Sequence, residues 1–301
     1  MPSPPNIFDL LTNLDKHANT HTPMSKKDYL KPPFQWTGGK SFSVPIIIPH
    51  LPYTSRYVEV FGGSGAVLLG RESSRLEVYN DIFSGLTCFY RCLKDENKYR
   101  QMVEWLELNI HSREEFYWNV THWRNVTDDV ERACRWYYTV VYSFNGLARS
   151  FGRTLQPIAG LAGSIHRKIA LFPELHARFR DVQVENQHWL DCMSDYDHPE
   201  TVFYCDPPYI DAYRGTYKHE MTEDDHREFL SHVFSMKGFV AVSGYPNPIY
   251  DDNPWDNKIT WDVRIMSKGL AKKDHANPWG TEDRQDVRGK STECLWIKEA
   301  R

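Results

Sequence analysis

The chain has 301 residues, of which 41% are apolar, and its formal net charge is −4 at pH 7. This length and composition are enough for one large globular core with room for an insertion. The six cysteines form no Cys-x-x-Cys pair, and no apolar run approaches the roughly twenty residues of a membrane span, so we expect reduced thiols, no bound metal and no membrane partner in a soluble cytoplasmic protein.

The amino-terminal residues 1–31 are polar, are punctuated by proline and show little periodicity, so we expect a flexible tail there. In residues 33–40, which read Pro-Phe-Gln-Trp-Thr-Gly-Gly-Lys, two glycines let the backbone approach a ligand closely, and Lys40 is expected to start the next helical segment. Taken alone, these residues indicate only a glycine turn before a helix.

Residues 56–61 form a short β-rich run that breaks into Gly62-Gly63-Ser64-Gly65 before a helical run at 66–69. A strand, a glycine loop and a helix in this order bring ligand atoms to the amino end of the helix, as in nucleotide sites. A second strand, 75–81, ends in Asp81, where doubly wound sheets bind ribose hydroxyls. Together the two strands predict an adenosine site. Because the loop has neither the spaced dinucleotide pattern nor a following Lys-Ser/Thr, S-adenosylmethionine fits better than NAD or ATP.

A long helical stretch, residues 93–180, separates this half of the chain from the next. Its aromatic segment 132–142 predicts a buried helix. The residues after that segment carry few acids and several basic side chains, namely Arg149, Arg153, Arg167, Lys168, Arg178 and Arg180. The net charge argues mildly against a nucleic-acid partner, but this positive patch can supply the local attraction that phosphates need. A solvated charged face explains the patch equally well.

The stretch 201–209 reads Thr-Val-Phe-Tyr-Cys-Asp-Pro-Pro-Tyr, an apolar strand that ends in an acid, two prolines and an aromatic ring. Proline cannot donate a ladder hydrogen bond, so strand pairing stops and the Asp206 carboxylate is held at the carboxyl end of the strand. Open α/β sheets bind ligands at that end. Asp206 and the Pro207 carbonyl offer adjacent acceptors for an amino group, and the Tyr209 ring can stack on a base.

The sheet is expected to continue on both sides of this stretch. A strand at 181–186 and a short helix at 189–194 precede it, and strands at 238–244, 258–264 and 292–298 follow it. Glu185 and Asp191 are placed to reach the adenine edge of a cofactor. Thr222 and Asp225 form a near capping box, which makes the following His226 structural rather than catalytic.

Four motifs in this order resemble those of the Dam-type DNA adenine-N6 methyltransferases, including their phage and prophage members. The matching residues are Trp36-Thr37-Gly38-Gly39-Lys40 for the amino-terminal cofactor motif, Glu59-Val60-Phe61-Gly62-Gly63-Ser64-Gly65 for the glycine motif, Asn80-Asp81 for the ribose-binding acid and Asp206-Pro207-Pro208-Tyr209 for the catalytic motif. The likeness covers most of the chain beyond the tail. Val60 departs from it, since members often carry proline there, and we expect this change to alter loop stiffness rather than chemistry.

The resemblance implies an α/β fold: a Rossmann-like, seven-stranded methyltransferase sheet with an antiparallel final strand and an inserted helical target-recognition domain. The catalytic domain that binds S-adenosylmethionine would comprise residues 32–92 and 181–301, and the insertion residues 93–180. The segment 144–149 resembles the DNA-reading loop of the family, and the loop 210–220 is placed to close over DNA. The residues expected to bind double-stranded DNA are Asn145, Leu147, Arg149 and Arg153.

The same resemblance implies the roles of the site residues. The catalytic residues would be Asp206, Pro207, Pro208 and Tyr209. The cofactor residues would be Trp36, Lys40, Glu59, Phe61, Gly63, Gly65, Asp81 and Asp206. The lone pair of an aromatic amino group is delocalised into the ring, so the two acceptors must localise it and aim it at the sulfonium methyl. A base inside a duplex cannot reach that methyl, so we expect base flipping.

Other functions stay open at this point. Cytosine-N4 methylation uses the same acceptor geometry, and methylation of an RNA base or a protein glutamine amide is a third possibility, which the long insertion disfavours. A catalytically silent DNA-binding regulator would keep the basic insertion but would need neither Asp81 nor Asp206. The resemblance suggests the cytoplasm of a bacterial or phage-infected cell and no obligate protein partner, and it is compatible with a role in restriction-modification.

Overall fold

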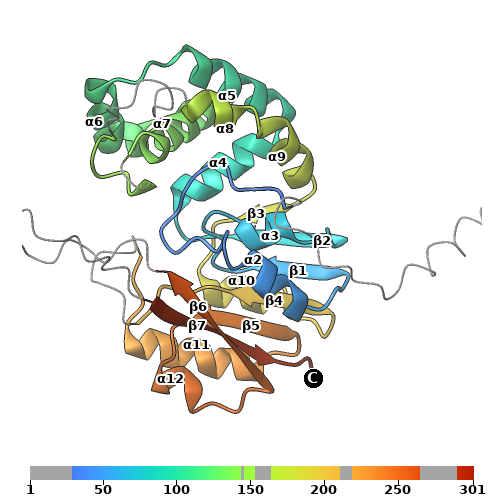
Figure 1. The fold of residues 1–301 in the computed structure, drawn as a ribbon. Coiled ribbons are helices and arrows are strands. Elements are labelled where there is room, and N and C mark those ends of the chain that lie inside the picture. Colours follow the sequence, from blue (N-terminus) through green and yellow to red (C-terminus); the bar gives the residue numbers. More distant parts are fainter. Residues whose placement is uncertain (1–28, 144–145, 153–163, 211–218, 265–289) are drawn as a thin grey trace, which may run out of the picture.

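The computed structural model describes residues 29–143, 146–152, 164–210, 219–264 and 290–301. Its centre is a seven-stranded sheet with the strand order β3-β2-β1-β4-β5-β7-β6 (Figure 1). The strands are β1 (Arg56–Glu59), β2 (Leu76–Asn80), β3 (Gln183–Glu185), β4 (Thr201–Cys205), β5 (Phe239–Gly244), β6 (Asn257–Arg264) and β7 (Lys290–Lys298). Strands β1 to β5 pair in parallel, whereas β7 is antiparallel to both β5 and β6. The predicted Rossmann-like sheet with an antiparallel final strand is confirmed.

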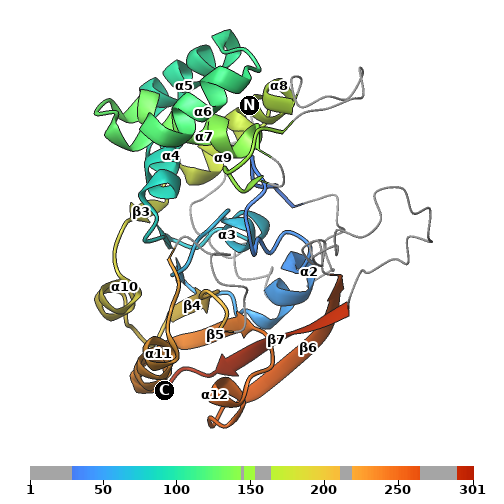
Figure 2. The same ribbon diagram turned by 90° about the vertical axis from the view of Figure 1, so that its left-hand side faces the viewer.

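Each face of the sheet packs against its own helices, because successive side chains along a strand point to opposite faces. On β1, for example, Tyr57 packs in one hydrophobic cluster and Val58 in the other. The helices on the Val58 face are α10 (Trp189–Asp195), α11 (Glu223–Ser235) and α12 (Pro248–Asp251). The helices on the Tyr57 face include α2 (Val44–Ile47) and α3 (Ala66–Gly70), and Figure 2 shows these two on the opposite side of the strands from α10 and α11. Burial on both faces explains why β4 and β5 are nearly continuous apolar runs.

A lobe of helices follows β2 and gathers at the β3 end of the sheet (Figure 1). Its members are α4 (Ser84–Lys94), α5 (Glu96–Leu108), α6 (Arg113–His122), η3 (Trp123–Asn125), α7 (Asp129–Val141), α8 (Ser164–Ile169) and α9 (Phe172–Phe179). Helix α7 buries Trp136, Tyr137 and Tyr138, which confirms the predicted aromatic buried helix.

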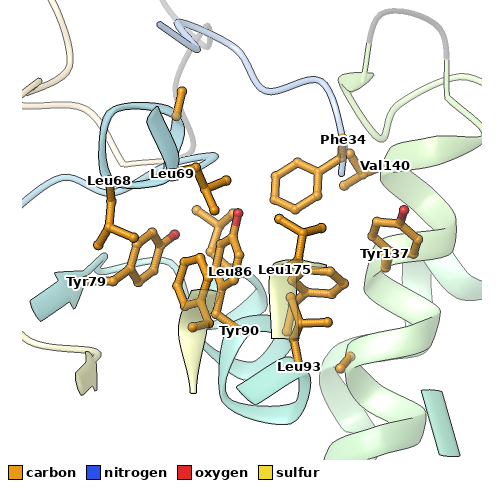
Figure 3. Close-up of a cluster of buried hydrophobic side chains, with 14 of the residues drawn as sticks. Phe34, Leu68, Leu69, Tyr79, Leu86, Tyr90, Leu93, Tyr137, Val140 and Leu175 are labelled. Carbon is orange, nitrogen blue, oxygen red and sulfur yellow. The ribbon is translucent and has the colours of Figure 1, made fainter. Parts of the chain in front are cut away.

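The helical lobe and the sheet share one continuous core. Figure 3 shows side chains of α3, β2, α4 and α7 packed together, among them Leu68, Tyr79, Leu86, Leu93 and Tyr137. Helix α4 runs through the predicted boundary between residues 92 and 93, so the helical stretch begins earlier than predicted. Because Leu86 and Leu93 lie on either side of that boundary in the same core, no linker separates sheet and lobe there.

A buried ion-pair network connects α9 to β2. Arg178 on α9 donates hydrogen bonds to both carboxylate oxygens of Glu77 on β2 and, at 2.7 Å, to the carbonyl oxygen of Leu68. Arg71 lies 3.2 Å from the same carboxylate. The side chain of Glu77 is only 5% exposed, so its charge inside the protein is compensated by these two arginines.

Candidate active site

A cavity opens at the carboxyl ends of β1, β2 and β4, where the sequence predicts ligand binding. Its empty volume is about 710 Å³, which includes space open to solvent. Gly65 does not line it; with a φ of 67°, this residue makes the left-handed turn into α3. The predicted cofactor residues that line the cavity are Trp36, Lys40, Glu59, Phe61, Gly63, Asp81 and Asp206.

Asp81 holds the glycine loop in place as well as facing the cavity. The N–H of Gly63 donates to Asp81 Oδ2 at 2.8 Å, and the N–H of Phe83 donates to Oδ1 at 2.8 Å. Burial raises the pKa of Asp81 to about 6, although these two hydrogen bonds lower it. Gly63 has a φ of 50°, and a Cβ atom built there would lie 3.0 Å from Cδ1 of Trp36. The sequence predicted the ribose-binding role of Asp81 but not this structural one.

Glu59 is an almost fully buried carboxyl group at the end of β1. Its Oε2 accepts hydrogen bonds from the Tyr57 hydroxyl at 2.9 Å and from the N–H of Leu68 at 2.6 Å. Burial raises the pKa of Glu59 to about 8, against the lowering effect of both bonds. The group is therefore mostly protonated at pH 7 and lines the cavity without a full negative charge.

The Asp206 carboxylate lies directly after β4, where the prolines end the strand as predicted. Its Oδ2 lies 2.8 Å from Nζ of Lys40, whose side chain is 5% exposed. Its Oδ1 accepts hydrogen bonds from the Ser243 hydroxyl at 2.7 Å and from the Tyr209 hydroxyl at 3.2 Å. Nζ of Lys40 also lies 4.9 Å from the centroid of the Tyr209 ring. The amino-terminal motif and the catalytic motif therefore meet at a single ion pair.

Lys40 does not start a helix, contrary to prediction. Helix α2 begins at Val44, and the Lys40 carbonyl accepts hydrogen bonds from the N–H groups of Ser43 and Val44 in the turn before it. Nζ of Lys40 donates to the Gly38 carbonyl at 2.9 Å. The glycine turn thus folds back on the lysine and holds its ammonium group at Asp206.

The sequence analysis missed two further hydroxyl groups of the site. Ser243 on β5 contacts Asp206, and the hydroxyl of Tyr204 on β4 lies 2.9 Å from the Ser243 oxygen. Tyr204 also lines the cavity. The available signal was the parallel pairing of β4 with β5, since neighbouring parallel strands end at the same edge of a sheet. The segment 238–244 was predicted only as a strand.

Aromatic and buried polar side chains pack around the catalytic motif. The ring of Tyr245 meets that of Tyr209 edge-on, with centroids 4.6 Å apart. His226 is buried, shares a 2.7 Å hydrogen bond with the Tyr250 hydroxyl, and has its pKa lowered to about 4 by burial. Helix α11, which carries His226, begins with a complete capping box of Thr222 and Asp225, as predicted. These contacts support the structural interpretation of His226.

The segment proposed to contact DNA lies beside the amino-terminal motif. Gly146 has a φ of 71°, and a Cβ atom there would lie 2.5 Å from the carbonyl oxygen of Gln35, the neighbour of Trp36. The predicted DNA-binding residues that the structure describes, both exposed, are Leu147 and Arg149. Those outside the described residues are Asn145 and Arg153, as are residues 211–218 of the predicted closing loop.

The predicted positive patch is smaller in the structure than in the sequence. Arg178 is engaged with Glu77, and Nζ of Lys168 donates to the Pro33 carbonyl at 3.1 Å. Burial lowers the pKa of Lys168 to about 8. Both side chains therefore brace the fold instead of facing a partner. Among the patch residues that the structure describes, the exposed ones are Arg149, Arg167 and Arg180.

Two acids predicted to reach the adenine edge, Glu185 and Asp191, are not among the described residues that line the cavity. The Glu185 carboxylate instead accepts a hydrogen bond from the Tyr196 hydroxyl at 3.2 Å. Within the described ranges, no group of three or more His, Cys, Asp or Glu residues is arranged to hold a metal ion. In the same part of the chain, no helix is both long enough and apolar enough to cross a membrane.

Known proteins are similar to this chain in sequence. Residues 36–259 match the family model of the D12 class N6 adenine-specific DNA methyltransferases. The chain is 24% identical over 243 residues to the DNA N-6-adenine-methyltransferase of Escherichia phage P1 and 25% identical over 224 residues to the retron Ec67 DNA adenine methylase of Escherichia coli. These alignments cover 73% and 70% of this chain, 31% of the phage protein and 74% of the retron protein.

The type II methyltransferase M1.LlaDCHI of Lactococcus lactis subsp. cremoris is 24% identical over 263 residues, which cover 74% of this chain and 84% of that protein. The chain thus spans less than a third of the phage protein and most of the other two. The span that matches the family model contains all four motifs and well over half of the chain. The chain belongs to the family of D12 class N6 adenine-specific DNA methyltransferases.

Proposed function

We propose that this chain transfers the methyl group of S-adenosylmethionine to the N6 amino group of adenine at specific sites in double-stranded DNA. The observation that carries the proposal is the position of Asp206 in the cavity that Asp81 and the glycine loop also line. One cavity thus combines a carboxylate suited to ribose hydroxyls with an acceptor suited to an amino group.

The residues of the cavity fit S-adenosylmethionine, which supplies an electrophilic methyl group on a sulfonium. After its two backbone hydrogen bonds, Asp81 keeps acceptor capacity on both oxygens for the ribose hydroxyls. Trp36 and Phe61 present aromatic surface to a purine ring. Gly63 leaves room beside Trp36 that a Cβ atom would fill.

Asp206 and the Pro207 carbonyl would each accept one hydrogen of the adenine amino group. These two bonds favour a pyramidal nitrogen and direct its lone pair along the axis of methyl transfer. The nitrogen would take the methyl group directly, with S-adenosylhomocysteine as the leaving group, and would then give up its extra proton, for which the Asp206 carboxylate is an acceptor. No covalent bond to the protein is needed. Tyr209 would stack on the adenine once it is flipped out of the duplex.

DNA would approach the cavity across the segment 146–149, which packs against Gln35. Arg149 is exposed there and is the proposed base-reading residue. Because the substrate is DNA, we place the activity in the cytoplasm of a bacterial or phage-infected cell.

Incubation with methyl-labelled cofactor and duplex DNA, followed by nucleoside analysis, tests the proposal. The expected product is N6-methyladenine at a defined site, and Asp206→Ala should form it at least about a hundredfold more slowly. N4-methylcytosine as the only product would reassign the target base. Tight DNA binding without methylation of any nucleoside would favour a catalytically silent regulator.

A further inference from the structure

We propose that Ser243 and Tyr204 form a hydrogen-bond relay that orients the Asp206 carboxylate for methyl transfer. Neither residue belongs to the four sequence motifs, and both are positioning residues that act through Asp206. The inference rests on the proposed methyl transfer to an amino group.

The relay is buried beneath the cavity. The hydroxyl of Tyr204 lies 2.9 Å from the Ser243 oxygen, which lies 2.7 Å from Asp206 Oδ1. Both Tyr204 and Ser243 are 1% exposed. Buried polar groups of this kind are normally hydrogen-bonded within the protein, as these two hydroxyls are.

The chemistry of the three groups fixes the direction of the hydrogen bonds. A carboxylate only accepts, so the single hydroxyl proton of Ser243 goes to Asp206. The Cys205 carbonyl is a poorer competitor for that proton, since it is uncharged and lies 3.5 Å away. The Tyr204 hydroxyl must then donate to the Ser243 oxygen, which stops the serine hydroxyl from rotating away.

The relay determines which oxygen of Asp206 can receive the substrate. Oδ1 accepts from Ser243 and Tyr209, whereas Oδ2 accepts from Lys40. A carboxylate has about four acceptor positions, so Oδ2 keeps one for an amino hydrogen. The terminal torsion of an aspartate is soft, and without the serine the carboxylate can turn and misdirect that position.

Ser243→Ala and Tyr204→Phe remove one hydroxyl each and keep the rest of the side chain. We expect Ser243→Ala to slow single-turnover methyl transfer by about ten- to a hundredfold, as for the loss of a charge-assisted hydrogen bond. Tyr204→Phe should cause a smaller loss. If the two hydroxyls act in series, the double variant should be no slower than Ser243→Ala, whereas independent structural effects would multiply.

The binding constants separate positioning from folding. Affinities for S-adenosylhomocysteine and for DNA should stay within about twofold of the wild type in each variant, because the relay acts only on the carboxylate. Ser243→Thr keeps the hydroxyl and should restore most of the rate. Thr201→Val is a matched control: Thr201 lies on the same strand as Tyr204 and its buried hydroxyl donates to the Tyr196 carbonyl at 2.8 Å, far along β4 from Asp206.

Thr201→Val should lower the stability and leave the methyl-transfer rate unchanged. A wild-type rate in Ser243→Ala, or multiplicative losses in the double variant, would overturn the relay. If Ser243→Ala does not fold, Tyr204→Phe decides alone: an unchanged rate refutes the relay. These outcomes are distinct from a wild-type protein that methylates no DNA, which would refute the proposed function instead.

Discussion

Replacing Asp81 with alanine is expected to weaken binding of S-adenosylhomocysteine, the product form of the cofactor. A hydrogen bond from a ribose hydroxyl to a carboxylate contributes about 1.5–3 kcal/mol. Losing one such bond raises the dissociation constant by about ten- to a hundredfold. The N–H groups of Gly63 and Phe83 also lose their acceptor, and an unpaired donor costs about 1–3 kcal/mol. Because Gly63 and Phe83 both line a cavity that is open to solvent, we expect the loss of stability from the two unpaired donors to lie near the lower end of this range, about 2 kcal/mol in total.

Calorimetric titration with S-adenosylhomocysteine measures the first effect, and denaturant unfolding measures the second. Asp95→Ala is the matched control, because the Asp95 carboxylate also accepts two backbone N–H groups, those of Asn97 and Lys98, at the start of α5. Asp95→Ala should lose a similar stability and keep the wild-type affinity. If Asp81→Ala behaved like Asp95→Ala in both measurements, Asp81 would only brace the loop, and the ribose assignment would fail.

Three more predictions follow from the site. Folding raises the pKa of Glu59 from 4.5 to about 8, so the folded chain binds this proton more readily than the unfolded chain does. The free energy of unfolding should therefore fall as the pH rises from about 4.5 to 8. Denaturation curves recorded across this range measure the slope, and Glu59→Gln should remove it. Arg149→Ala should relax the mapped recognition sequence at one position, with about 1–3 kcal/mol less discrimination, whereas an equal loss of activity at every site would make Arg149 a phosphate contact. Asp206→Ala should slow single-turnover methylation by about a hundredfold to ten-thousandfold with little change in cofactor affinity. Asp206→Asn should slow it somewhat less, because its amide oxygen still accepts one hydrogen bond. A near wild-type rate in Asp206→Ala would contradict the catalytic assignment.

The sheet and the cavity were predictable because each rests on local sequence patterns. An apolar run that ends in Asp206 and two prolines marks the end of β4, and the glycines after Glu59 mark the turn into α3. Because β1 and β4 pair in parallel, their carboxyl ends lie at the same edge of the sheet. The pattern therefore predicted which residues gather there, although it could not show that Lys40 contacts Asp206.

The contacts that the sequence did not reveal depend on tertiary packing. Arg178 and Lys168 were predicted to lie in a positive patch because charge counts do not show whether a side chain has a buried partner. The helical stretch was predicted to start at residue 93, inside α4, because the apolar face of that helix continues the core of the sheet without a break in composition. Ser243 was overlooked because a serine inside a strand carries no pattern of its own.

The buried ion-pair network of Arg178 and Glu77 affects how the DNA specificity of this chain could be changed. Glu77 lies on the strand that delivers Asp81 to the cofactor cavity, and its partner Arg178 belongs to the lobe that carries the proposed recognition segment. A lobe transplanted from a relative would need to bring an arginine to this glutamate. Without one, Glu77 would keep its ion pair with Arg71 but lose the hydrogen bonds from Arg178, and each hydrogen bond to a charged group typically contributes about 1.5–3 kcal/mol. Exchange of specificity in this chain is therefore expected to succeed in loops, such as 146–149, sooner than in whole helices.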